Sequence, residues 1–185
     1  MADLAYRNDI MDYRRGRADW GAIWAGLFSF VAIWSVFGLL GEAIFASNAN
    51  PNAAHPVTGM NIGMSIWAII LTAIAMYVGG RVTGHLAGVA SRRDATVHGL
   101  AMFGLGVIAA VVVIVLAGTA LAGGVGLQQV TGVHSPYALS VFADLGWAGF
   151  VALFLGWLGA MFGCNQGVKA GTASAREVRE IRPAA

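Results

Sequence analysis

Four long apolar stretches separated by short polar segments dominate the pattern along the chain. They cover about residues 20–45, 62–90, 95–122 and 136–167. Each exceeds the roughly 20 apolar residues that a helix needs to cross the core of a bilayer. The segment 107–116 is rich in β-branched residues and by itself resembles a buried strand, but the length of the surrounding run and its lack of turn signals favour a helix. The pattern predicts an all-α membrane protein with four transmembrane helices.

Polar segments bound this transmembrane domain, which we place at residues 18–168. Residues 1–17 carry mixed charges and are predicted to form a cytoplasmic arm, and the small and charged residues 169–185 a flexible or peripheral cytoplasmic tail. Asp19 and Asp94 directly precede the first and third stretches, where a carboxylate can accept hydrogen bonds from the free backbone amides of a helix start. Both are therefore predicted to cap a helix.

The basic residues predict the orientation of these helices. All 11 Lys and Arg residues fall in three clusters, and the polar segments between the clusters contain none; the clusters lie within residues 7–17, 81–93 and 169–182. Cytoplasmic segments of membrane proteins carry an excess of Lys and Arg. The sequence therefore predicts two outer loops, at about 46–61 and 123–134, and both termini in the cytoplasm.

The composition also indicates a protein that is partly surrounded by lipid. The chain is 58% hydrophobic and 11% charged, whereas soluble domains have roughly 25% charged residues. The formal net charge of +2 lies beside the membrane helices, so we expect the lipid bilayer and its anionic headgroups as partners, and no nucleic acid. Cys164 is the sole cysteine. It cannot form an internal disulfide, and we expect it to be a small packing residue.

The two predicted hairpins resemble each other. Glycine triplets with four-residue spacing end the second and fourth helices, 79 positions apart; they are Gly80, Gly84 and Gly88, and Gly159, Gly163 and Gly167. At an offset of 78, Gly21 and Gly26 match Gly99 and Gly104. We interpret this as a parallel duplication of a hairpin, with the repeats related by an axis along the membrane normal. Arg81 and His85 occur only in the first repeat, because Ala160 and Cys164 take their places in the second.

Each glycine triplet lies along one stripe of its helix, where the absence of side chains lets a neighbouring backbone approach closely. Two interpretations stay open for the six glycines. They pack the helices of one bundle together, or they form a contact between subunits of an oligomer or a larger complex.

Polar residues gather near the predicted inner face, and we single out Arg81, His85, His98 and Asp19. Arg81 and His85 lie four residues apart on one face of the second helix. Three roles are open for Arg81: an anchor paired with Asp19 or Asp94, a site for an anionic lipid headgroup or other anion, and a transport gate. His85 and His98 are suitable metal ligands in principle, but no further ligand stands at a suitable spacing, so no metal or cofactor is expected.

The outer side carries two acids, Glu42 near the end of the first helix and Asp144 in the fourth. If they face the interior of the bundle, they would form a cation or proton site. If they lie at the membrane–water interface, both carboxylates stay hydrated. His55 and His134 lie in the two outer loops at the repeat offset. They would approach each other if the repeats pair, and otherwise cap loops or face solvent.

No arrangement typical of catalysis is present. The sequence contains no Ser/His/Asp pattern, and its Gly-rich stretches lie within apolar helices instead of following strands. We therefore expect a protein that is not an enzyme.

Three segments carry a family resemblance: WGAIWAG at 20–26, GGRVTGHLAG at 79–88 and RDATVHGL at 93–100. With the topology, they resemble an uncharacterised family of glycine-rich, four-helix bacterial inner-membrane proteins that are sometimes labelled PhnA-like. The resemblance covers about residues 20–121. It implies a bacterial inner membrane and no catalytic residue.

Few polar residues lie inside the predicted helices, which favours packing over a hydrated path. We expect a membrane protein that acts through helix packing, as a homo-oligomer or as an accessory or scaffold subunit of a larger complex. The alternative is a small channel or transporter with Glu42 and Asp144 at its outer mouth and Arg81 and His85 at its inner one.

Overall fold

A computed structural model of the chain describes residues 18–47, 58–88, 91–124 and 136–181. Four helices make up this part of the protein: α2 (Trp20–Ser47), α3 (Thr58–Leu86), α4 (Arg92–Gly124) and α5 (Pro136–Ile181). Each contains a segment long and apolar enough to cross a membrane. The prediction of an all-α protein with four candidate transmembrane helices is confirmed.

The helix starts are capped in two different ways. Oδ1 of Asp19 accepts a hydrogen bond of 3.1 Å from the backbone N–H of Ala22, as predicted. At α4, however, Ser91 takes the capping position, because its Oγ accepts a 3.2 Å bond from the backbone N–H of Arg93. Asp94 lies inside the first turn, so the prediction that it caps this helix is wrong. Its carboxylate still has a favourable position relative to the helix dipole.

Two helix ends also differ from the predicted bounds. Helix α3 ends at Leu86 instead of residue 90, and Gly88 follows with a φ of 61° that favours glycine. Helix α5 does not end at residue 167 but continues to Ile181. The segment after Lys169 is rich in Ala, Arg and Glu, which favour a helix, so residues 169–181 extend α5 and do not form an irregular tail.

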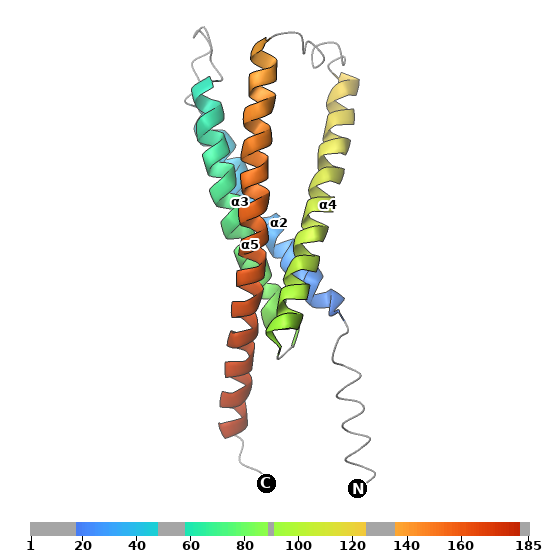
Figure 1. Ribbon diagram of the computed structural model, residues 1–185, viewed down its shortest axis with the longest axis vertical. Helices are drawn as coiled ribbons and strands as arrows, with labels where there is room; N and C mark the ends of the chain where they lie inside the picture. Colours follow the sequence, from blue (N-terminus) through green and yellow to red (C-terminus); the bar gives the residue numbers. More distant parts are fainter. Residues whose placement is uncertain (1–17, 48–57, 89–90, 125–135, 182–185) are drawn as a thin grey trace.

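The helices run alternately up and down, so that α2 and α4 begin at the end of the molecule where α3 and α5 finish (Figure 1). Helices α3 and α5 are parallel and make the most extensive contact, and α2 packs mainly on α3. Helix α4 packs on α5 and, less extensively, on α2 and α3. No contact joins α2 to α5 within the described residues. The parallel pair α3–α5 therefore forms the main helix–helix contact of the bundle.

The apolar core lies in the half of the bundle near the α3–α4 turn. Ile23, Met76, Met102 and Ala160 form one buried cluster with a residue from each helix. Away from this core, residues 146–155 of α5 are largely exposed, and α4 and α5 diverge toward the opposite end (Figure 1). The bundle is therefore closed at the end that holds the α3–α4 turn and open between α4 and α5 at the other.

Candidate functional site

The contact between α3 and α5 is made by glycines that face the backbone of the opposite helix. A Cβ added at Gly80 or Gly84 would collide with the carbonyl of Ala160 or Cys164. From the other side, a Cβ at Gly163 or Gly167 would collide with the backbone of α3, and one at Gly159 would lie 2.8 Å from the Ala73 carbonyl oxygen. The two helices approach each other closely because no side chain separates them.

These contacts distinguish between the two interpretations of the glycine stripes. Five of the six predicted packing glycines are engaged inside one chain: Gly80, Gly84, Gly159, Gly163 and Gly167. They are therefore not available for a contact between subunits. Gly88 differs, because it lies beyond the end of α3 and an added Cβ would meet nothing within 4 Å. Its φ of 61° gives it a role in ending the helix, and among the described residues it packs against no other helix.

The register of α3 and α5 differs from the repeat in the sequence. Gly163 faces Tyr77 and Gly167 faces Arg81, 86 positions apart, and Gly80 faces Ala160 and Gly84 faces Cys164, 80 positions apart, whereas the glycine triplets repeat after 79. The mean of the two contact separations, 83, differs from the repeat by four residues, or about 6 Å along a helix. A simple rotation about the membrane normal would place equivalent residues at the same depth, so the α3–α5 pair departs from the predicted symmetry.

The two hairpins also pack differently. In the first, α2 and α3 cross at Gly26 and Gly79, where a Cβ on Gly79 would lie 2.6 Å from the Gly26 carbonyl oxygen. Thr83 is fully buried at this crossing, and its hydroxyl donates a 3.0 Å bond to the Gly79 carbonyl. In the second hairpin, Gly104 matches Gly26, but an added Cβ there would meet nothing within 4 Å.

Asp19 and His98 form one polar site at the start of α2 and α4. The backbone N–H of Asp19 donates a 2.9 Å hydrogen bond to Nε2 of His98, and Nδ1 of the same ring lies 2.8 Å from the Asp94 carbonyl oxygen. His98 is only 4% exposed. Both residues were candidates from the sequence, but their contact was not predicted. They are 79 positions apart, the same offset as the glycine triplets.

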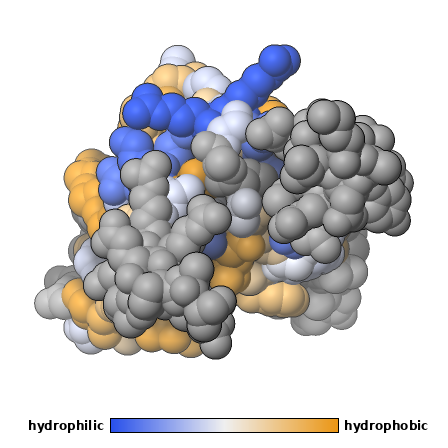
Figure 2. All heavy atoms as spheres, turned by 90° about the horizontal axis from the view of Figure 1, so that it is seen from below, coloured by the Kyte–Doolittle hydropathy of each residue, from blue (hydrophilic) through white to orange (hydrophobic). Residues whose placement is uncertain are grey.

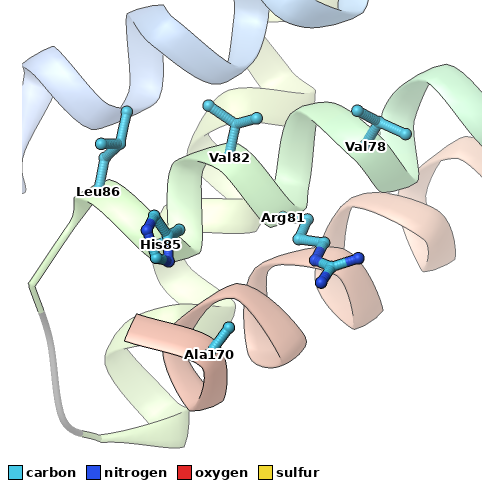
Figure 3. Close-up of a pocket in the computed structure, with 6 residues that line it drawn as sticks. All are labelled: Val78, Arg81, Val82, His85, Leu86 and Ala170. Carbon is cyan, nitrogen blue, oxygen red and sulfur yellow. The ribbon is translucent and has the colours of Figure 1, made fainter. Parts of the chain in front are cut away.

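Arg81 and His85 lie apart from that site, on an exposed margin of α3 beside α5 (Figure 3). Within the residues described, no ion pair joins Arg81 to Asp19 or Asp94, so the predicted anchoring pair is not formed. Both basic side chains line a groove of about 390 Å³ whose other walls are apolar; it is completed by Val78, Val82, Leu86 and Ala170. Seen from the end of the molecule that holds the α3–α4 turn, hydrophilic residues gather beside hydrophobic ones (Figure 2).

One polar contact that sequence analysis missed borders the same margin. The hydroxyl of Tyr77, one turn before Arg81, donates a 3.3 Å hydrogen bond to Oε1 of Gln166. The sequence shows a tyrosine four residues before Arg81, which places its hydroxyl on the same face of α3. Its partner on α5 could not be predicted, because it depends on the register of the two helices.

The remaining candidates are not brought into one site. Glu42 is exposed in α2, whereas the Asp144 side chain, His55 and His134 lie outside the described residues. Among the residues described, no group of three His, Cys, Asp or Glu side chains is placed to hold a metal ion. Cys164 is fully buried between α4 and α5, against Ala95 and Val168.

The fold and its apolar surface define a multi-pass α-helical membrane protein. Comparison of the chain with protein-family models, curated proteins and solved structures finds no match. The resemblance to PhnA-like proteins stays a prediction from three short segments.

Proposed function

We propose that this protein is a non-enzymatic component of the bacterial inner membrane, with both termini in the cytoplasm. It acts through helix packing, as a homo-oligomer or as an accessory subunit of a larger membrane complex. The observation that carries the proposal is the open face between α4 and α5. Among the described residues, an added Cβ at Gly146 or Gly149 of α5, or at Gly104 of α4, would meet nothing within 4 Å, although the glycines of the α3–α5 pair are tightly packed.

Glycine in a helix costs about 1 kcal/mol relative to alanine. In the α3–α5 pair, close contact between backbones offsets this cost. At Gly104, Gly146 and Gly149, no contact among the described residues does so. Lipid chains adapt to side chains of any size, so lipid contact alone gives these positions no need for glycine. A helix from a second subunit, approaching α5 as closely as α3 does, accounts for Gly146 and Gly149. Gly104 follows Gly99, which faces α5, by five residues and so lies about 140° around α4, where a separate contact of the same kind accounts for it.

The apolar core supports packing over the alternative of a small channel or transporter. Ile23, Met76 and Met102 fill the closed end of the bundle with side chains that are at most 2% exposed. Every buried polar side-chain atom in the part of the chain described has a hydrogen-bond partner. A hydrated path needs polar groups that face one another across water, and this arrangement offers none at that end among the described side chains.

The proposed orientation rests on the basic residues. Arg92 and Arg93 begin α4 at the closed end, and Arg81 and Lys169 lie toward the same end of α3 and α5. An excess of Lys and Arg marks the cytoplasmic side. The closed end therefore faces the cytoplasm, and the opening between α4 and α5 faces the outer leaflet.

Native mass measurement after extraction in a mild detergent tests the packing proposal. We expect a particle heavier than the 19.2 kDa chain, containing further copies or foreign subunits in a fixed ratio across independent preparations. Gly149→Leu should reduce it to the single chain while the thermal unfolding of that chain stays unchanged. Val151→Leu, a small change on a side chain that is 37% exposed in the same segment, is the matched control. A wild-type protein that is monomeric in every mild detergent would overturn the proposal.

A further inference from the structure

A basic side chain that has no acidic partner among the described residues lies in the membrane-spanning part of α3. Arg81 is exposed, and no carboxylate is among the residues that line its groove. Among the described side chains, the two acids at the closed end have other positions: Asp19 caps α2, and Asp94 lies in the first turn of α4. An uncompensated guanidinium at the edge of a bilayer is expensive unless it meets water or an anion.

The groove around Arg81 combines this charge with apolar walls. Arg81 and His85 point to the side of α5, and Val78, Val82 and Leu86 follow the adjacent strip of α3 (Figure 3). Further from the closed end, Ile74 stands one turn before Val78 on nearly the same face and is 53% exposed. The basic part of the groove is therefore continuous with an apolar track along the helix.

The depth of Arg81 suits a headgroup at one end of that track. It lies five residues before the end of α3 at Leu86, or about 7.5 Å along the helix axis. Its backbone faces Gly167 of α5, and Lys169 follows two residues later. Arg81 is therefore close to the predicted membrane surface, where lipid phosphates are found.

We propose that this groove binds one anionic phospholipid. Arg81 and His85 donate hydrogen bonds to the phosphate, and an acyl chain lies along Val78 and Ile74. Arginine suits this role because its planar guanidinium donates two parallel hydrogen bonds to a phosphate. A zwitterionic lipid is disfavoured because no carboxylate lines the groove to receive its ammonium group. The inference rests on the membrane placement proposed above and is independent of the oligomer.

Native mass spectrometry of the full-length protein, purified in detergent with added lipid, tests the proposal. The probes are phosphatidylglycerol and phosphatidylcholine with matched acyl chains. We expect the wild type to retain phosphatidylglycerol at least about tenfold better, and Arg81→Gln to lose about tenfold of that retention, as expected when a charge-assisted hydrogen bond is removed. Lys169→Gln removes a charge near the same membrane surface but outside the groove, and should leave retention unchanged.

A second variant guards against misfolding of Arg81→Gln. Val82→Trp fills the groove without changing its charge, and should also abolish retention while the helical content and unfolding temperature stay at the wild-type values. Equal retention of the two lipids, or equal losses in Arg81→Gln and Lys169→Gln, would overturn the proposal.

Inorganic phosphate distinguishes the source of the anion. We expect a large excess of phosphate to leave the bound phosphatidylglycerol in place, because the acyl chain contributes to binding. Complete displacement by phosphate would show a site for a free anion and would contradict the lipid assignment. A monomeric wild type that still retains phosphatidylglycerol would overturn the packing proposal and leave the lipid site intact.

Discussion

The backbone N–H of Asp19 donates a 2.9 Å hydrogen bond to Nε2 of His98, which joins the start of α2 to the first turns of α4. A backbone amide can only donate and a carbonyl can only accept. Since Nδ1 of the ring lies 2.8 Å from the Asp94 carbonyl oxygen, the imidazole is neutral and carries its proton on Nδ1. His98 is therefore a structural link between two helices and is not available as a metal ligand in this arrangement.

Replacing His98 with Phe should destabilise the bundle. The change leaves the Asp19 N–H without its acceptor in a partly buried contact, and the expected loss is about 1 kcal/mol. Thermal unfolding in detergent, followed by circular dichroism, measures it. His85→Phe is the matched control, because His85 is exposed and no hydrogen bond is expected to be lost. Equal effects of the two changes would mean that the Asp19–His98 bond does not stabilise the fold.

Gly84→Ala should separate α3 from α5. The added methyl group collides with the carbonyl of Cys164, and relief requires movement of backbone, which costs about 1–3 kcal/mol or more. Gly104→Ala is a matched change in open space and should be neutral or stabilise the isolated chain by up to about 1 kcal/mol through helix propensity. Unfolding temperatures of the two single-chain variants provide the comparison. A Gly84→Ala protein as stable as Gly104→Ala would refute close backbone packing at this site.

The cap of α4 can be tested by changing two neighbouring residues. Ser91→Ala removes the acceptor for the Arg93 N–H and should cost about 1 kcal/mol. Asp94→Ala removes a charge that the helix dipole favours, an effect of about 0.3–1 kcal/mol that salt screens. We therefore expect the loss in Asp94→Ala to fall at high ionic strength and the loss in Ser91→Ala to persist. The reverse pattern would restore Asp94 as the cap.

The orientation can be read by cysteine labelling in spheroplasts. Cys164 is fully buried and should stay unlabelled by a membrane-impermeant maleimide, so it can be kept as the internal control. Ala53→Cys, in the predicted first outer loop, should react in intact spheroplasts, whereas Ala2→Cys should react only after the membrane is opened. Labelling of Ala2→Cys in intact spheroplasts would invert the topology and would place the Arg81 groove in the outer leaflet.

The amino-acid sequence determined the elements of this protein. The four candidate spans and the Asp19 cap follow from signals that are local in the chain, since hydropathy and capping depend on one segment and its solvent. The error at Asp94 has a local cause as well, because Ser91 stands at the same helix start and one hydroxyl is enough to begin α4 three residues earlier. The glycine stripes also marked correctly which faces of α3 and α5 are small.

Only the tertiary structure decided how those faces meet. A stripe of small residues repeating every four positions looks the same after a slip of one turn, so its sequence does not choose between registers. Tyr77 contacts Gly163, and not a residue one turn away, because the volumes of side chains on both helices together set the register. The packing of the four helices also leaves Arg81 without an acid and Gly104 without a neighbour among the described residues. Both features depend on distances between segments far apart in the chain, which no local pattern records.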